Sequence, residues 1–414
     1  MNSHDGRVWI ASEIYYPEET STGYILTKLA EGLGTTHRVA VLCAQPSYER
    51  SGMRTPAREQ TRGVDIFRVA HPGLDRSRIV GRTVNVVIVT LRIFVKAVRQ
   101  LRRGDVVIVV TNPPLLPFAV RAAAIFRRAS VALLVHDLYP EAAILAGVLS
   151  PRGMAARVWR GASNWLFRHV DRIVVLGRDA ADLIAARMPD GAARIRVIGN
   201  WADIDVVRPH PPDENALLRS AGLEKRFVLG YVGNMGRVHD IEMLLRAARA
   251  LRTSAPDVHL LFIGSGSKSG LVASAAAEPS SNVTLLGPRD RTEQDAFLNA
   301  CHVSVMALAP GMAGVGVPSR LYNVLAAGRP LVAAVDEESE PALVLAEERV
   351  GVQTPPGDAE AFVRAVVSLR ADPQFLREAG LRARHAATER FGFDRTLAAY
   401  DALLRELQSS SDSR

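Results

Sequence analysis

The segment HDLYPE (residues 136–141) places an imidazole and two carboxylates directly after the apolar run SVALLV. Side chains of this kind move protons or hold hydroxyl groups when they lie at the edge of a ligand site. Their place after a strand predicts that His136, Asp137 and Glu141 lie at a ligand site. A helix start with Pro140 in its first turn explains Asp137 and Glu141 as well, and this alternative stays open.

A glycine-rich segment, GMAGVGVPSRLYNVLAAGRPLVA (residues 311–333), runs directly into a predicted helix. Pro318 stands near the first turn, where backbone amides lack intrahelical acceptors. Helix N-termini attract anions, and an arginine fork suits phosphate oxygens. This pattern predicts a diphosphate site. Its predicted residues are Gly316, Val317, Ser319 and Arg320.

Four other loops also follow apolar runs and open helices. GNMGR (residues 233–237) lets the backbone approach a ligand closely and adds Arg237 as a phosphate fork. Gly264 begins a G-x-G-x-x-x-G segment whose spacing does not match a dinucleotide fingerprint, so it is predicted to form a wall of a nucleotide site. Arg289 adds a further cation, and Gly23 lies where the first strand's loop enters the first helix.

The elements that must position these loops alternate through the whole chain. Val- and Ile-rich runs such as DVVIVVT predict parallel strands covered on both faces, with helices as crossovers. The proline-rich segment RPHPPDENA predicts a linker. We therefore predict an α/β protein with two Rossmann-like, doubly wound parallel-sheet domains facing a cleft. The predicted ranges are 1–207, 208–390 and a C-terminal helix, 391–414, that crosses back or stays with the second domain and ends in a disordered tail.

Composition limits the class of partner. Lys and Arg exceed Asp and Glu by 51 − 43 = 8, which favours an anionic partner. The two cysteines have neither a disulfide nor a metal spacing, and no metal site is predicted. Aromatic residues make up 6% of the chain and do not interleave with a basic stripe, which argues against nucleic acid. The N-terminus lacks a signal-peptide layout, and the apolar stretch Thr83–Leu91 is too short to span a bilayer, so a cytoplasmic protein is expected.

One predicted helix carries basic residues on a single face. Arg92, Lys96, Arg99 and Arg103 recur at steps of four, three and four residues, beside an apolar stripe of Val87, Leu91, Val95 and Val98. This pattern predicts peripheral contact with an anionic membrane at the inner face of the cell membrane. A sheet-covering helix with a solvated outer face is the alternative.

Taken together, the motifs YYPEETSTG, TNPP, HDLYPE, GNMGR, LLFIGSG and GVPSRLYNVLAAGRP resemble the retaining GT-B glycosyltransferases of family 4. The likeness is greatest to the bacterial fucosamine- and fucosyl-type transferases of O-antigen, colanic acid and capsule synthesis. It implies that the second domain holds a UDP- or GDP-sugar as substrate, without a cofactor or metal. The first domain would hold a glycan or polyprenyl-diphosphate-linked acceptor. The resemblance implies that His136 hydrogen-bonds the donor sugar or leaving group and that Asp137 and Glu141 hold hydroxyl groups or orient His136, so these three are the predicted catalytic residues.

The chain departs from the family pattern at four positions. The family's diphosphate-clamping Arg and Lys fall on Asn234 and His239, which are therefore included among the donor-binding residues. Its two glutamates, eight residues apart, fall on Val315 and Asn323. Asn323 can still donate and accept hydrogen bonds and is a predicted donor-binding residue, whereas Val315 cannot bond a sugar hydroxyl in that way. We predict a retaining glycosyltransferase of surface-polysaccharide synthesis. A nucleotide-sugar 2-epimerase or hydrolase of the same fold, and a non-catalytic partner in polysaccharide assembly, are the alternatives.

Overall fold

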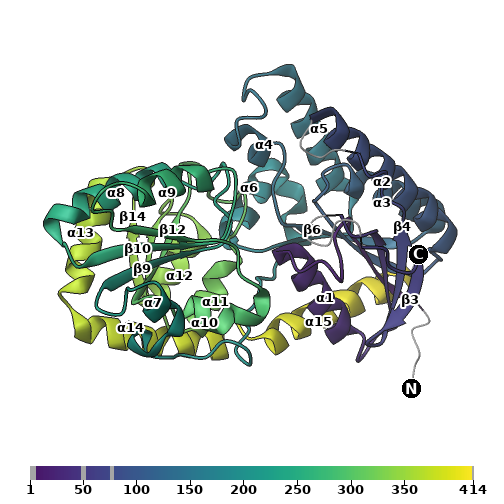
Figure 1. Cartoon of the computed structure of the whole chain (residues 1–414). Coiled ribbons are helices and arrows are strands. Elements are labelled where there is room, and N and C mark those ends of the chain that lie inside the picture. Colours follow the sequence, from purple (N-terminus) through teal and green to yellow (C-terminus); the bar gives the residue numbers. More distant parts are fainter. Residues whose placement is uncertain (1–5, 48–52, 75–78, 413–414) are drawn as a thin grey trace.

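The computed structural model describes residues 6–47, 53–74 and 79–412. Figure 1 shows two lobes side by side, each built around its own sheet, with the chain passing between them twice. The first sheet has eight strands and the second has six. The predicted architecture of two α/β lobes is confirmed.

The first sheet has the order β3-β4-β2-β1-β5-β6-β7-β8, and its neighbours pair in parallel except β3 with β4. β3 was not predicted, because its sequence REQT has no apolar residue; a tight turn at Arg62 and Gly63, both with positive φ, folds it back on β4. The strands are β1 (Val8–Ala11), β2 (Val39–Ala44), β3 (Arg58–Thr61), β4 (Val64–Val69), β5 (Val106–Val110), β6 (Ser130–Val135), β7 (Arg172–Val175) and β8 (Ile195–Val197).

Helices cover both faces of this sheet. Apolar residues of α2, α3, α5 and α6 share one core cluster with the sheet, and residues of α1 and α15 share the cluster on the opposite face. Strands such as β5, with burial on every residue, are apolar throughout for this reason. The helices are α1 (Ser21–Leu33), α2 (Ile79–Gln100), α3 (Leu116–Arg127), α4 (Glu141–Leu145), α5 (Met154–His169), α6 (Arg178–Arg187) and the 3-10 helix η1 (Pro189–Arg194).

The second sheet is parallel throughout, in the order β11-β10-β9-β12-β13-β14. Its strands are β9 (Phe227–Val232), β10 (Val258–Ile263), β11 (Val283–Leu286), β12 (Val303–Ala307), β13 (Leu331–Ala334) and β14 (Gly351–Thr354). Its helices are η2 (Pro212–Glu214), α7 (Ala216–Ser220), α8 (Ile241–Ser254), α9 (Ser269–Ala276), η3 (Arg291–Glu293), α10 (Gln294–Leu298), α11 (Arg320–Ala326), α12 (Glu340–Glu348), α13 (Ala359–Arg370) and α14 (Pro373–Glu389).

The last helix, α15 (Phe393–Asp412), lies with the first lobe, whereas α14 packs on α11 in the second. Figure 1 shows α15 in yellow beneath α1. The segment that leaves the first lobe after β8 and the segment that returns to it before α15 meet where the Ala202 amide donates to the Phe391 carbonyl at 2.7 Å. The two crossings therefore form one joint between the lobes. The boundaries after residues 207 and 390 stay predictions.

Candidate functional site

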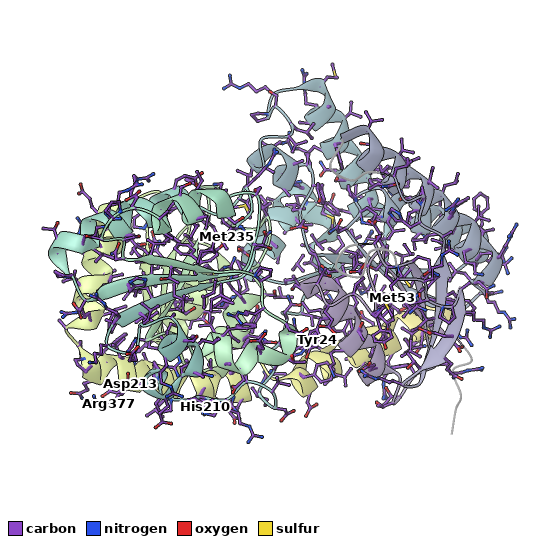
Figure 2. All side chains as sticks on the ribbon, viewed as in Figure 1. Tyr24, Met53, His210, Asp213, Met235 and Arg377 are labelled. Atoms are coloured by element: carbon purple, nitrogen blue, oxygen red, sulfur yellow. The ribbon has the colours of Figure 1, made fainter. Side chains whose placement is uncertain are left out.

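A cavity of about 650 Å3 lies between the lobes, beyond the carboxyl ends of their strands. The start of α1 and the segment after β8 form its wall on the first-lobe side. The loops after β9 and β11, together with α10 and α11, form the other wall. Figure 2 places Tyr24 at the junction of the two lobes. Four predicted donor-binding residues line this cavity: Arg289, Ser319, Arg320 and Asn323.

Arg320, the first residue of α11, is held at the centre of the second-lobe wall. Its Nη1 donates to the Val232 carbonyl at 2.9 Å, and its Nη2 donates to the Tyr231 hydroxyl at 3.2 Å. The guanidinium also lies 4.6 Å from the centroid of the Tyr231 ring. A guanidinium has more N–H donors than these two bonds use. Arg320 is thus a fixed cation with donors left for an anionic ligand.

The start of α11 meets the first lobe directly. Ser319 lies at the N-cap without capping the helix, and its hydroxyl is 2.8 Å from that of Ser21 at the start of α1. The first amides of each helix have no intrahelical acceptor. At α1, the side chain of Thr20 takes one of them, the amide of Gly23. Two helix starts therefore face one another across the cavity, and Gly23 itself is enclosed by the Glu18 carbonyl.

The loop after β9 contains a neutral histidine beside Arg320. The Gly236 amide donates to His239 Nδ1 at 3.2 Å, which leaves the proton on Nε2. Burial, and then the charge of Arg320, lower the pKa of His239 to about 3. His239 is therefore a hydrogen-bond donor at neutral pH. Lys268 is a second cation here, since its Nζ donates to the His239 carbonyl at 2.8 Å, and His239 does not line the cavity.

Asn234 and Arg237 of the same loop have different neighbours. The Asn234 carbonyl accepts from the Tyr231 hydroxyl at 2.7 Å. Arg237 reaches across to the first lobe, where its Nη1 donates to the Ala146 carbonyl at 3.4 Å. Neither residue lines the cavity.

Gly264 has a structural explanation in the packing of two loops. A Cβ at Gly264 would lie 2.1 Å from the Gly233 carbonyl oxygen, and its φ is +135°. The neighbouring Met235 amide donates to the Ser265 carbonyl at 2.8 Å, so the loops after β9 and β10 touch through their backbones. Glycine is needed there for close approach, and Gly264 does not line the cavity.

The HDLYPE segment lies against the glycine-rich loop of the other lobe. Thr111, after β5, accepts hydrogen bonds from the amides of His136 and Asp137 at 3.1 and 3.2 Å. The Leu138 amide donates to the Val315 carbonyl at 2.8 Å. A Cβ at Gly316 would meet Asp137 Oδ1 at 3.3 Å. His136, Asp137 and Gly316 are thus brought together, although none of them lines the cavity.

His136 has a buried Nε2 without a hydrogen-bond partner in the described ranges of the chain. Burial lowers the pKa of His136 to about 4 and raises the pKa of Asp137. His136 is therefore neutral at neutral pH. An unpaired buried imidazole nitrogen costs about 1–3 kcal/mol unless a ligand pairs with it.

Glu141 and Val317 lie in contacts of other kinds. Glu141 begins α4, and its Oε1 pairs with Arg160 at 3.1 Å and with Arg187 at 2.8 Å. These bonds tie α4 to α5 and α6. The Val317 side chain packs in the apolar clusters of both lobes. The functional roles of both residues stay predictions.

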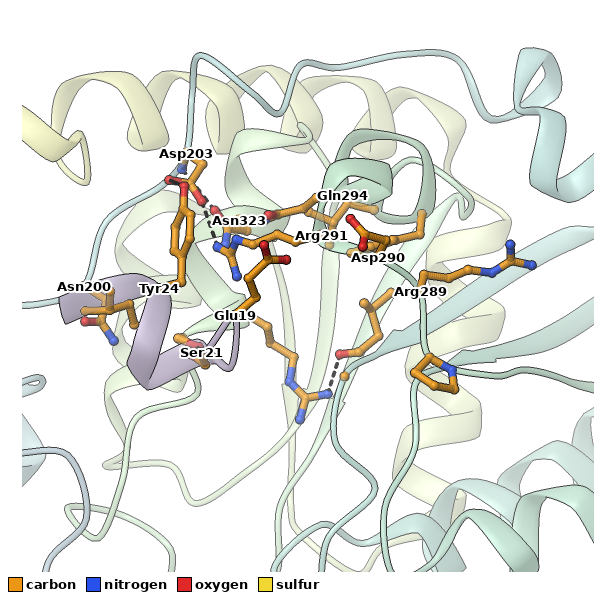
Figure 3. A pocket seen from close by; sticks show the side chains of 18 of the residues that line it. Glu19, Ser21, Tyr24, Asn200, Asp203, Arg289, Asp290, Arg291, Gln294 and Asn323 are labelled. Carbon is orange, nitrogen blue, oxygen red and sulfur yellow. Dashed lines mark hydrogen bonds and ion pairs between the residues drawn. The ribbon is translucent and has the colours of Figure 1, made fainter. Parts of the chain in front are cut away.

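The structure adds a polar group that the sequence reasoning missed, made of Tyr24, Asp203 and Arg291. The Tyr24 hydroxyl donates to Asp203 Oδ1, and Arg291 Nη2 donates to Asp203 Oδ2, each at 3.1 Å. Figure 3 shows Arg291 and Tyr24 pointing toward Asp203, while Arg289 extends away. The guanidinium of Arg291 is 3.3 Å from the Tyr24 ring centroid. Asp203 also ties to α11, because its amide donates to Asn323 Oδ1 at 3.0 Å.

A second group missed from the sequence joins the lobes beside the glycine-rich loop. Asp179 of α6 is buried, and its Oδ2 accepts from the amides of Gly314 at 2.9 Å and Glu340 at 3.0 Å. The neighbouring Arg178 pairs with Glu340 at 3.0 Å. The glycine-rich loop is therefore held by a carboxylate of the opposite lobe. Asp179 and Asp203 could have been found from the sequence by their position, since each follows the end of a predicted strand by a few residues.

The basic face of α2 lies outside this site. Arg92 donates to the Ala70 carbonyl at 2.5 Å, and Lys96 Nζ lies 5.6 Å from the Phe67 ring centroid. Arg99 is exposed on α2, whereas Arg103 is exposed in the turn after the helix, which ends at Gln100, so the prediction that Arg103 lies on the helix is wrong. Val98 packs partly against the core. The exposed apolar side chains of α2 are Val80, Val84, Val87, Leu91 and Val95. None of the helices within the described ranges has both the length and the apolar character needed to cross a bilayer.

Two Rossmann-like lobes that face a cleft, with a cation and two helix starts in it, define a protein of the GT-B type. A family model described as "Glycosyl transferase 4-like domain" matches residues 22–201, and one described as "Glycosyl transferases group 1" matches residues 226–372. The chain is a GT-B glycosyltransferase with these two domains.

Individual relatives agree with this class. The chain is 28% identical to "Probable glycosyltransferase WbjE" of Pseudomonas aeruginosa over 365 residues, which are 87% of this chain and 88% of that protein. It shares its fold with Anabaena Alr3699/HepE, solved in complex with UDP and glucose, at a TM-score of 0.72 and 16% identity over 97% of this chain and 99% of that one. WaaG, a glycosyltransferase involved in lipopolysaccharide biosynthesis, has a TM-score of 0.68 at 14% identity over 95% and 99%.

Proposed function

We propose that this glycosyltransferase moves a hexosyl or N-acetylhexosaminyl group from a nucleoside-diphosphate sugar to a glycan or polyprenyl-diphosphate-linked acceptor. The proposal includes retention of anomeric configuration, independence of metal, a fucosamine- or fucosyl-type donor, and a place in bacterial surface-polysaccharide synthesis. The observation that carries it is the fixed Arg320 guanidinium at the start of α11, facing α1 across the cavity. The UDP and glucose named for the HepE complex and the lipopolysaccharide role named for WaaG support it.

Charge development on the leaving diphosphate is the main demand of such a reaction. In the proposal, Arg320 and the amides at the start of α11 hydrogen-bond the diphosphate oxygens as the glycosidic bond breaks. Donors held in place before the reaction stabilise that charge without reorganising. The side chain of Asn323, which lines the cavity, would add a neutral hydrogen bond, and neutral His239 would donate one from Nε2 beside the charges of Arg320 and Lys268.

His136 has a separate role in the proposal. Its buried Nε2, which has no hydrogen-bond partner among the residues that the structure describes, would bond a hydroxyl of the donor sugar at the junction of the lobes. Because the pKa of His136 is lowered to about 4, the imidazole offers a neutral bond rather than a charge. The contacts of Asp179 with the glycine-rich loop would hold the lobes closed and limit the access of water to the donor.

The direct test combines donor binding with product analysis. A thermal-shift panel of UDP, GDP, ADP and CMP should single out one nucleotide, because a ligand at 100 times its Kd adds about 2.7 kcal/mol. The matching sugar nucleotides are then incubated with and without acceptor, with and without EDTA. We expect transfer only with acceptor, an unchanged rate in EDTA, and the donor's anomer in the product by NMR. Conversion of the donor alone would refute transfer, and an inverted product would refute retention.

The proposal also places the exposed face of α2 on an anionic membrane surface. The apolar stripe from Val80 to Val95 lies beside Arg92 and Arg99, as in helices that lie in the plane of a membrane interface, and exposed Arg103 follows in the next turn. Arg92 and Lys96 already contact the protein, so Arg99 and Arg103 are the better residues to change. A lipid-linked acceptor would be reached from this surface.

Vesicle binding tests this surface. A basic residue near an anionic bilayer contributes about 1 kcal/mol, so changing Arg99 and Arg103 to Glu should weaken binding to phosphatidylglycerol vesicles by at least about 30-fold. The matched control changes Arg364 and Arg377 to Glu, two exposed residues of the second lobe. Equal binding by both double variants would remove α2 from the proposal.

A further inference from the structure

A second cavity, of about 270 Å3, lies at the opposite end of the first lobe from the cleft. Its lining comes from the middle of α3, the end of α5, the start of β7, and η1, which leads into β8. The cleft residues follow the carboxyl ends of the same strands, so the length of the sheet separates the two sites. The lining residues are Arg121, Arg168, His169, Val170, Asp171, Arg172 and Arg194.

This cavity has an excess of positive charge. Asp171, its only acidic lining residue within the described chain, accepts from the Val131 amide at 2.9 Å. Arg172 pairs with Glu406 of α15, and Glu406 also accepts from Arg196 at 3.1 Å. The four lining arginines and Arg196 against Asp171 and Glu406 leave 5 − 2 = 3 positive charges. Such a concave cationic surface attracts anions.

Two of the arginines have donors left for a ligand. Arg121 has a buried Nε without a hydrogen-bond partner in the described part of the chain. Arg168 is exposed, and among the described residues its side chain makes no hydrogen bond or ion pair. Arg194 is held in place by a 2.6 Å bond from its Nη1 to the Arg168 carbonyl. A buried donor without a partner is costly, and an anion in the cavity would remove that cost.

Exposed apolar side chains border the cavity. Ile125, which is 54% exposed, lies one helical turn beyond Arg121 on the same side of α3. Trp165 is 45% exposed and stacks on His169 with ring centroids 4.5 Å apart. A free phosphate ion would make no apolar contact with these side chains, whereas the hydrocarbon part of an amphiphile would pack against them.

We propose that this cavity binds the phosphate group of an amphiphile, with the arginines on the phosphate oxygens and the apolar border on the hydrocarbon part. The favoured source is a lipid headgroup that carries a terminal phosphate, because arginine forks bind exposed phosphate oxygens in pairs. This site is distinct from the donor site and does not depend on the contact of α2 with a membrane.

The test compares vesicles of phosphatidic acid and phosphatidylserine at equal surface charge, using the full chain. The wild-type protein should prefer phosphatidic acid by about tenfold, the effect of one charge-assisted bond. Arg168→Gln should abolish the preference without changing the melting temperature, because that side chain forms no hydrogen bond or ion pair with the described part of the chain. Arg157→Gln, an exposed arginine of α5 outside the cavity, is the control and should keep it.

A second variant and a soluble competitor make the result decisive. The double variant Arg168→Gln, Arg194→Gln should also lose the preference for phosphatidic acid. The double variant Arg99→Glu, Arg103→Glu should bind both lipids more weakly but keep that preference. If millimolar inorganic phosphate displaced the protein from phosphatidic acid vesicles as strongly as added phosphatidic acid does, the ligand would not be an amphiphile. The absence of a preference in the wild-type protein, or its persistence in both cavity variants, would overturn the site.

Discussion

Arg320→Gln is the change that tests the donor site most directly. Glutamine keeps a polar side chain of similar length but removes the charge and the fork. In the wild-type protein the guanidinium is fixed by hydrogen bonds to Val232 and Tyr231 at 2.9 and 3.2 Å, so the Arg320 side chain loses little conformational entropy when a diphosphate binds. A charge-assisted hydrogen bond contributes about 1.5–3 kcal/mol, which predicts a Kd for the preferred nucleoside diphosphate raised about 10- to 100-fold.

Isothermal titration with the nucleoside diphosphate and with the corresponding nucleoside separates the phosphate contact from a general disturbance of the cavity. We expect the diphosphate to lose the full factor and the nucleoside to lose little. Arg289→Gln is the matched control, because Arg289 is an exposed arginine of the same cavity whose side chain pairs with Glu293 at 3.4 Å. The reasoning fails if both ligands weaken equally, or if Arg289→Gln costs the diphosphate as much as Arg320→Gln.

Three further predictions concern protonation, lobe closure and thiol reactivity. The pKa of His136 is lowered from 6.5 to about 4 in the folded protein, so the unfolded chain binds more protons below pH 6.5 and the wild-type protein loses stability as the pH falls. Between pH 7.5 and pH 5, the free energy of unfolding measured in urea should fall by about 2 kcal/mol less in His136→Gln than in the wild-type protein. An equal fall in both proteins would contradict this prediction. Asp179→Asn removes the charged acceptor of the Gly314 and Glu340 amides and should raise the radius of gyration in small-angle scattering, whereas Asp182→Asn, at an exposed position of the same helix, should not. An unchanged radius of gyration in both variants would show that Asp179 does not hold the lobes together. Burial raises the pKa of Cys43 to about 12 and of Cys301 to about 11, so neither should react with Ellman's reagent at pH 8 until the protein is unfolded, and fast labelling of the native protein would show that one of them is accessible.

Strand positions were predictable because a parallel strand covered on both faces must be apolar along its length. The runs that became β5 and β6 are of this kind, and both are buried on every residue. β3 was not predictable, because an edge strand with alternating exposure can consist of polar residues only. The glycine-rich loop and Arg320 were also readable from the sequence, since a helix start with free amides is a local feature.

What the sequence by itself determined was the class: two α/β domains, with site residues at the strand ends. Only the tertiary structure decided which of those residues meet. Gly264 turned out to serve backbone packing against Gly233, and Arg291 rather than Arg289 reached Asp203 from 88 positions away. The physical reason is that local patterns report burial and capping within one element. The partner of a charged side chain depends on how two lobes and two crossings bring distant segments together.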